Sequence, residues 1–187
     1  MDMKEVIRRV ADGDTDAFEI IVQQYQQKIY MFCYFMLGHR QEAEDAAQEV
    51  FFKAYRSLSH YNHESEEMFL AWLYRIASNY CNTLLKRKKK GQLLLLLFRS
   101  IRDEQSAEQA YAEQEDHRLD WLAGMTAEEK EILALRVIED KPFDEISVIL
   151  DISSATVRKR FQRIRLKLKK NKAQWEGTIY EQRCESQ

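Results

Sequence analysis

The fold is decided by the stretch from Lys141 to Lys172, KPFDEISVILDISSATVRKRFQRIRLKLKKNK. Pro142 is the only proline of the chain, and in the first turn of a helix its missing N–H costs no hydrogen bond. A short helix should begin there, with an apolar stripe made of Phe143, Ile146, Ile149 and Leu150. Asp151 can take the left-handed conformation that ends this helix, and Ser153 can cap the next. The stretch therefore predicts a helix, a tight turn and a second helix.

The second predicted helix separates apolar from basic residues. At about 100° per residue, one narrow arc holds Val157, Phe161, Ile164 and Leu168, and this arc should face the first helix. The opposite side carries Ala155, Arg158, Lys159, Gln162 and Arg163. Between Ser153 and Lys172 there are nine Lys or Arg residues and no acid, although the whole chain has a net charge of −2. Cations around side chains that reach base edges suit a helix in the major groove. We predict a helix-turn-helix with its recognition helix second; the alternative is an ordinary amphipathic surface helix.

Composition limits the remaining possibilities. The chain has 187 residues, 45% of them hydrophobic, which is enough for one domain or two small ones. The five glycines fall between periodic segments and no strand-like alternation is sustained, so the expected class is all-α, two small helical domains joined by a flexible linker. No apolar run approaches a membrane span and no signal peptide is evident, so we expect a cytoplasmic protein. Three widely spaced cysteines and an isolated His60 and His63 predict neither a metal site nor a cofactor.

Two further helices are expected in the first half of the chain. DAFEIIVQQYQQKIYMFCYFMLG should be capped by Asp14 or Thr15 and end at Gly38, and the linker HRQ should lead to EAEDAAQEVFFKAYRSL. In the latter, Ala43, Ala46, Ala47, Val50, Phe51, Ala54 and Leu58 form the buried side. The outer side keeps the polar residues, which are the acids Glu42, Asp45 and Glu49 together with Gln48. Part of this charge suits the helix dipole, and the rest predicts a docking surface for a basic partner.

A polar loop and a basic helix come next. Residues 57–67, SLSHYNHESEE, lack a helical period and are expected to form a long loop. The helix MFLAWLYRIASNYCNTLLKRKKK should end in the five consecutive cations of residues 86–90. Trp72, Tyr74 and Tyr80 are interleaved with polar residues, and aromatics beside cations can stack unpaired bases while the cations follow the phosphates. For Trp72 a plain core position is the open alternative.

The predicted domains are residues 1–90, a linker 91–116, a helix-turn-helix domain 117–172 and a frayed polar tail 173–187, polar from Asn171 onward. The C-terminal domain should also contain HRLDWLAGM and TAEEKEILALRVIED as helices, the second opened by a capping box of Thr126 and Glu129. The apolar block Leu93–Leu97 with Phe98 has no periodic assignment. Either a neighbouring helix or a partner should cover it.

Four segments together resemble the extracytoplasmic-function (ECF) group of bacterial sigma-70-type sigma factors. They are DAFEIIVQQYQQKIYMFCYFMLG, EAEDAAQEVFFKAYRSL, FLAWLYRIASN with its basic run, and KPFDEISVILDISSATVRKRFQRIR. The resemblance covers most of the chain in order. It implies a transcription initiation factor that binds core RNA polymerase and directs it to promoters. The N-terminal domain would correspond to sigma region 2, which melts and reads the minus-ten element, and the C-terminal domain to region 4, which reads the minus-thirty-five element.

The resemblance also implies residue roles. Contacts to the coiled coil of the β′ subunit of core RNA polymerase fall on Asp45, Gln48, Glu49 and Phe52. Contacts to the minus-ten element of promoter DNA fall on His60, Tyr61, Asn62, Trp72, Arg75, Asn79, Lys86, Arg87 and Lys88. Contacts to the minus-thirty-five element fall on Ser154, Thr156, Arg158, Lys159, Gln162, Arg163 and Arg165. The family's common membrane-anchored anti-sigma factor is one candidate to cover residues 93–98. Thr83 and the turn residues 153–155 depart from the family pattern, which leaves the promoter sequence open.

Two other functional classes compete with this one. The sequence has no Gly-rich phosphate loop and no G-x-S-x-G, so an enzyme with a small-molecule substrate is not predicted. The stronger rival is an autonomous repressor or activator, because helix-turn-helix domains often bind their operators as dimers. The acidic helix around Asp45 and the second basic run favour the polymerase subunit over this rival.

Overall fold

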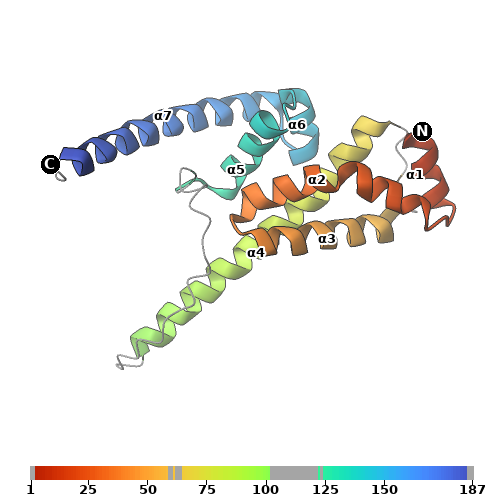
Figure 1. Ribbon diagram of the computed structural model, residues 1–187, viewed down its shortest axis with the longest axis horizontal. Coiled ribbons are helices and arrows are strands. Elements are labelled where there is room, and N and C mark those ends of the chain that lie inside the picture. The colour runs from red at the N-terminus through yellow and green to blue at the C-terminus, as the bar shows by residue number, and fades with distance from the viewer. Residues whose placement is uncertain (1–2, 59–60, 62–64, 102–121, 123, 185–187) are drawn as a thin grey trace. The chain divides into compact units, whose positions relative to one another are not determined.

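The computed structural model describes residues 3–58, 61, 65–101, 122 and 124–184, with residues 95–101 and 171–184 described by their backbone alone. The described chain is helical, which confirms the predicted all-α class. It folds as two compact units, residues 1–116 and 117–187 (Figure 1). The elements are α1 Met3–Ala11, α2 Ala17–Leu37, α3 Arg40–Ser57, α4 Glu66–Ile101, α5 Ala127–Leu133, the π-helix η3 Ala134–Ile138, α6 Phe143–Leu150 and α7 Ser154–Cys184.

In the first unit α2, α3 and α4 pack around one apolar core. Fully buried side chains come from all three helices, among them Ile21, Ile29, Phe32, Val50, Ala54, Phe69, Leu73 and Tyr74. Gly38 ends α2 as predicted, with φ of 77° and its N–H donating to the Tyr34 carbonyl at 2.8 Å. A residue with a side chain would be strained at this φ, so the sharp turn between α2 and α3 uses the freedom of glycine.

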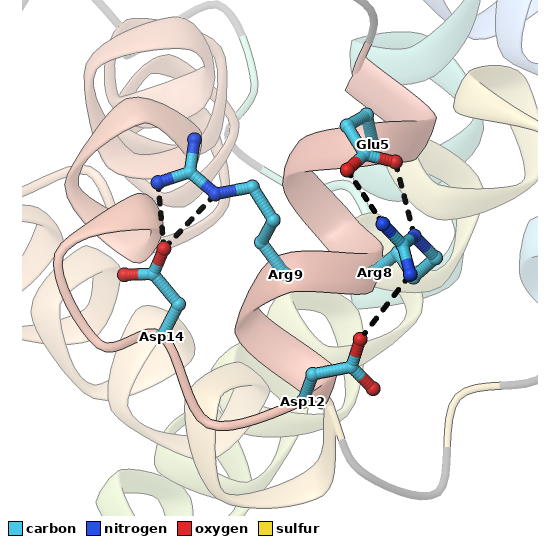
Figure 2. Close-up of polar contacts among 5 residues, drawn as sticks. All are labelled: Glu5, Arg8, Arg9, Asp12 and Asp14. Atoms are coloured by element: carbon cyan, nitrogen blue, oxygen red, sulfur yellow. Dashed lines mark hydrogen bonds and ion pairs between the residues drawn. The ribbon is translucent and has the colours of Figure 1, made fainter.

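The helix α1 was not predicted from the sequence. Its buried residues Met3, Val6, Ile7 and Val10 follow spacings of three, one and three, which is the signal that would have identified it. Figure 2 shows the ion pairs around its C-terminal end: Arg8 contacts Glu5 at 2.7 Å and Asp12 at 3.5 Å. These exposed pairs contribute little stability, so the apolar stripe is what holds α1 in place.

Asp14 joins α1 to α2. Its Oδ1 accepts the N–H of Ala17, the first residue of α2, at 3.1 Å, whereas the residue at the N-cap position is Asp16 and not the predicted Asp14 or Thr15. Its Oδ2 accepts two hydrogen bonds from the Arg9 guanidinium, at 2.6 and 2.9 Å (Figure 2). The Arg9 hydrogen bond, followed by the backbone N–H of Ala17, lowers the pKa of Asp14. The helix start is thus fixed by one carboxylate that serves both a cap and an ion pair.

Three helix ends differ from the sequence predictions. The expected linker HRQ is shorter, because His39 precedes α3 and Arg40 already belongs to it. The helix α4 does not end at Lys90: it continues through Gly91 to Ile101. A single glycine costs only about 1 kcal/mol in a helix, and the leucines after it are strong helix formers. Similarly, α7 continues to Cys184, where a frayed tail was expected. The predicted linker at residues 102–116 and most of the helix HRLDWLAGM lie outside the described residues.

The second unit contains the predicted helix-turn-helix. The helix α6 begins at Phe143, directly after Pro142. Asp151 has φ of 56° and ψ of 45° and its N–H donates to the Ser147 carbonyl, as the sequence predicts for the turn. The hydroxyl of Ser153 accepts the Thr156 N–H at 3.2 Å and so caps α7. The core of this unit consists mainly of Leu122, Ile132, Leu133, Leu135, Ile146, Ile149, Val157 and Ile164.

The capping box that opens α5 is also confirmed. The Thr126 hydroxyl accepts the Glu129 N–H at 3.3 Å, and the Glu129 carboxylate accepts the Thr126 N–H at 2.9 Å. The same carboxylate contacts the Lys167 Nζ on α7, at 2.7 and 2.8 Å for its two oxygens. This contact connects α5 to the recognition helix α7 over 38 positions of sequence.

Candidate nucleic-acid and polymerase interfaces

The recognition helix α7 presents its basic side to solvent. Val157 and Ile164 are fully buried against the rest of the unit. The opposite side is exposed and carries Arg158, Lys159, Gln162 and Arg163, and Arg165, which lies nearer the buried side, is exposed as well. This is the arrangement that the helical periodicity predicted, and it leaves five long polar side chains able to reach phosphates or base edges.

Arg158 also belongs to the contact between α6 and α7. The Phe143 and Phe161 rings pack with centroids 5.5 Å apart, and the Arg158 guanidinium lies 5.8 Å from the Phe143 centroid. Asp144 approaches Arg158 at 3.7 Å, with both side chains more than half exposed. This contact is weak, because exposed ion pairs gain little in water. Arg158 is therefore held near the surface by α6 and remains available to a ligand.

Two predicted DNA contacts belong to the turn itself. The Ser154 hydroxyl is buried and has no hydrogen-bond partner among the described residues. The Thr156 hydroxyl lies 2.7 Å from that of Ser153. Both hydroxyls sit where α7 begins, and they are less accessible than the basic side chains that follow.

An aromatic cluster forms between Tyr61 and the first turns of α4. The Tyr61 ring lies 4.9 Å from that of Trp72 and 5.3 Å from that of Phe69, and Phe69 lies 5.6 Å from Trp72. Burial raises the pKa of Tyr61 to about 12, so its phenol is neutral at physiological pH. Trp72 is half-buried, so it contributes to the core and also reaches the surface. His60 and Asn62 lie outside the described residues.

The two tyrosines of α4, Tyr74 and Tyr80, differ in burial. Tyr74 is fully buried and belongs to the core, so the expected stacking role for it is wrong. Tyr80 is half-buried, with the Lys53 ammonium 5.7 Å from its ring centroid. Periodicity could have excluded Tyr74, because it lies next to the buried Leu73 and three residues before the buried Ala77.

The basic run lies on one exposed stretch of α4. Residues 86–90 are all exposed, and so are Arg75 and Asn79 nearer the aromatic cluster. Lys88 forms an ion pair with Glu42 on α3. One of the four cations predicted to contact the minus-ten element is thus engaged by the neighbouring helix. The sequence could not show this pairing, because the two residues lie 46 positions apart.

The outer side of α3 is acidic with one large apolar residue. Asp45 and Gln48 are exposed, Glu49 is half-buried and pairs with Lys53 at 3.2 Å, and Phe52 is 54% exposed. A groove of about 500 Å³ lies beside this side, between α2 and α3. It is lined by Val22, Gln26, Gln27, Tyr30, Glu44, Ala47, Gln48 and Phe51. The sequence does not reveal this groove, which forms only when the two helices pack together.

The part of the chain that the structure describes holds no group of three or more His, Cys, Asp or Glu residues able to bind a metal ion. Cys33 and Cys81 are fully buried and free. Their mutual hydrogen bond and their burial raise the pKa of Cys33, so this thiol stays protonated.

A helix-turn-helix unit accompanied by a helical unit with an acidic side and a basic helix defines a DNA-binding protein of the transcription machinery. Family models agree with both units: residues 21–91 match sigma-70 region 2 and residues 119–168 match sigma-70 region 4. The chain is 34% identical over 182 residues to the ECF RNA polymerase sigma factor SigW of Bacillus subtilis, covering 91% of this chain and 96% of that one. It is 30% identical to the RNA polymerase sigma-H factor of Pseudomonas aeruginosa, over 87% of this chain and 89% of that one.

The chain belongs to the ECF RNA polymerase sigma factors, which confirms the predicted family and function. Sigma factors are transcription initiation factors and not enzymes. Solved structures agree on the fold. CnrH in complex with the cytosolic domain of CnrY aligns with a TM-score of 0.67 and 20% identity, over 89% of this chain and 94% of that one. RpoE in complex with the anti-sigma factor NepR from Bartonella quintana aligns with a TM-score of 0.61 and 18% identity, over 82% and 95%.

Proposed function

We propose that this sigma factor divides its work among three surfaces. The acidic side of α3 binds the β′ coiled coil of core RNA polymerase, the loop and α4 bind the minus-ten element, and α7 reads the minus-thirty-five element. The predicted domain limits 1–90, 91–116 and 117–172 describe this division, with the helix that carries the basic run reaching into the linker. The observation that carries the proposal is the segregation of charge: the acids of α3 gather at residues 42–49, and exposed cations gather at residues 86–90 of α4 and at residues 158–170 of α7.

The α3 surface suits a basic helical partner. Asp45, Gln48 and Glu49 line one side of the helix, and Phe52 provides an exposed apolar anchor among them. Interfaces of this kind combine an aromatic anchor with a polar rim that steers association. The groove beside Gln48 can accept an apolar side chain of the same partner.

The α4 surface suits an opened promoter. Tyr61 and Trp72 form a partly exposed aromatic pair on which an unpaired base can stack, and His60 and Asn62 are the sequence neighbours of Tyr61. Arg75, Asn79, Lys86, Arg87 and Lys88 extend from this pair along the helix and can follow the phosphates. Lys88 must exchange Glu42 for a phosphate to take part.

The α7 surface suits the major groove of the upstream element. Arg158, Lys159, Gln162, Arg163 and Arg165 are the exposed candidates for base and phosphate contacts. Ser154 and Thr156 start the helix, where hydroxyl and backbone N–H groups commonly contact phosphate.

The proposal also includes an anti-sigma factor that controls this sigma factor. As is common in the family, this partner would be anchored in the membrane. The structure of RpoE was solved with the anti-sigma factor NepR, and that of CnrH with the cytosolic domain of CnrY. Within the described residues no helix is long and apolar enough to cross a membrane. We place the site of action in the cytoplasm, where promoters and polymerase are found.

A charge-reversal experiment tests the α3 assignment. Asp45→Lys together with Glu49→Lys should weaken binding to core RNA polymerase by about tenfold or more, because like charges then face a basic partner. Asp12→Lys together with Glu19→Lys makes the same charge change at exposed positions outside α3 and should leave binding unchanged. Equal binding by both double variants in a pull-down with core enzyme would refute the assignment.

A gel shift separates the sigma factor from its rival. A dimeric repressor or activator should bind duplex promoter DNA tightly by itself and prefer a palindrome. The proposed function predicts weak binding by the isolated chain and specific binding once core RNA polymerase is added. Tight palindromic binding without polymerase would favour the rival.

A further inference from the structure

The basic run of α4 continues directly into an apolar segment. Residues 86–101, KRKKKGQLLLLLFRSI, which we call the basic–leucine segment, lie on one unbroken helix. In Figure 1 this end of α4 extends beyond α2 and α3. The segment contains six Lys or Arg residues and no acid. DNA binding accounts for its cations, but neither the DNA contacts nor the polymerase contacts of the proposed function use its leucines.

The first two leucines of the apolar run are exposed. Leu93 is 58% exposed and Leu94 is 55% exposed. Five leucines and Phe98 follow one another without interruption, which is more than one helical turn of about 3.6 residues. A run of this length distributes apolar residues around the helix axis, so a single flat contact with one neighbouring helix covers only part of it. Exposed apolar surface of this kind marks an interaction site.

We propose that the basic–leucine segment binds the surface of a bilayer that contains anionic phospholipids. Its lysines and arginines can reach headgroup phosphates, while the leucines enter the boundary of the acyl chains. Arg99 lies beyond the leucines, so cations flank the apolar run on both sides. The six-residue apolar run of the helix is about 9 Å long. It is far short of the roughly 30 Å needed to span.

The pattern distinguishes a bilayer from other occupants. Duplex DNA neutralises the cations but offers nothing to the leucines. A helix that binds a protein groove shows apolar residues at spacings of three and four on one face, with polar residues on the other. Here cations both precede and follow an apolar run that continues around the whole helix. A helix that lies in the boundary of an anionic bilayer meets headgroup phosphates and acyl chains together.

Membrane and promoter would then compete. Lys86, Arg87 and Lys88 are the same cations that we propose for the minus-ten element, so one surface cannot serve both at once. This consequence rests on the proposed function, whereas vesicle binding itself does not. Bound to a membrane surface, the chain would be held away from promoters.

Vesicle sedimentation with the full chain tests the proposal. The probes are vesicles of equal parts phosphatidylglycerol and phosphatidylcholine, and vesicles of phosphatidylcholine alone. The chain should bind the first and not the second. Leu93→Ser together with Leu94→Ser should weaken binding about tenfold or more, since two exposed leucines then lose their transfer into the acyl boundary. Lys89→Gln together with Lys90→Gln should also weaken it. Leu166→Ser, at a 68% exposed leucine of α7, is the matched control and should bind normally.

Transcription separates this inference from the proposed function. Without vesicles, the variant with Leu93→Ser and Leu94→Ser should initiate with core enzyme as well as the unchanged chain. The inference is overturned if the chain does not bind anionic vesicles. It is also overturned if the leucine variant binds as well as the unchanged chain, which would mean charge attraction alone. A third contrary result is a leucine variant that loses a soluble acidic protein partner but keeps its vesicle affinity.

Discussion

Glu129→Ala should lower the free energy of unfolding of the second unit by about 2 kcal/mol. The side chain of Glu129 is only 16% exposed. The variant loses the hydrogen bond from the Thr126 N–H, which contributes about 1 kcal/mol. It also loses the ion pair with Lys167. This pair contributes no more than about 1 kcal/mol to stability, because the Lys167 side chain is 47% exposed. Hydrogen exchange of the full chain measures the effect within one unit, where the slowest amides of α5 and α7 should exchange about 30-fold faster.

Glu128→Ala provides the matched control. Glu128 is the adjacent acid of the same helix, 66% exposed, and it pairs with Arg160 at 2.7 Å. An exposed pair of this kind contributes less than about 1 kcal/mol, so exchange should rise by no more than about fivefold. Equal effects of the two substitutions would refute the reasoning, because burial and the capping box would then make no difference.

The same carboxylate predicts a pH dependence. Burial alone would raise the pKa of Glu129, but the hydrogen bonds from Lys167 and Thr126 outweigh it and hold the pKa below its ordinary value of 4.5. A carboxyl whose folded pKa is lowered stabilises the fold above the ordinary value and loses this contribution as pH falls through the folded pKa. The difference in exchange between the unchanged chain and Glu129→Ala should therefore be constant near neutral pH and shrink in acid. A difference that grows in acid would contradict the assigned direction.

Three further changes test other parts of the chain. Arg163→Ala should weaken recognition of the upstream element by about 1–3 kcal/mol if it contacts a base, as measured by in vitro transcription with core enzyme on promoters with and without that element. Tyr25→Phe removes the 2.9 Å hydrogen bond to Glu66 and should cost about 0.5–1.5 kcal/mol in urea denaturation followed by circular dichroism. Asp151→Val should destabilise the second unit by about 1–2 kcal/mol and Asp151→Gly should not, because φ of 56° strains a branched side chain; exchange of α6 amides reports the difference.

Each of these has a result that counts against it. Equal loss on both promoters with Arg163→Ala would place the residue outside the upstream contact. An unchanged denaturation midpoint for Tyr25→Phe would show that the Glu66 hydrogen bond contributes nothing net. If the valine and glycine variants at position 151 were equally stable, the left-handed turn would not be the constraint that we describe.

Helix identity was largely predictable, whereas helix ends were predictable only where a local signal sets them. Pro142, Asp151 and Ser153 act through backbone conformation and hydrogen bonds within four residues, so their effects on the turn can be read locally. Gly91 shows the limit: its local cost is about 1 kcal/mol, and strong helix formers on both sides carry α4 past it. The helix α1 was missed although its apolar spacing was present.

For the candidate surfaces, too, some features were predictable from the sequence and others were not. Periodicity alone predicted the exposed basic side of α7 and the acidic side of α3, because solvent exposure follows the helical repeat around a buried stripe. It could not pair Lys88 with Glu42, nor reveal the groove between α2 and α3.

By itself, the sequence determined the class of fold, the helix-turn-helix and which sides of its helices carry charge, since these depend on neighbours within one or two turns. Tertiary structure alone decided which distant side chains meet, as Glu129 meets Lys167 and Tyr61 meets Trp72. The physical reason is that such contacts depend on how whole helices pack, and a one-dimensional pattern carries no distance between them.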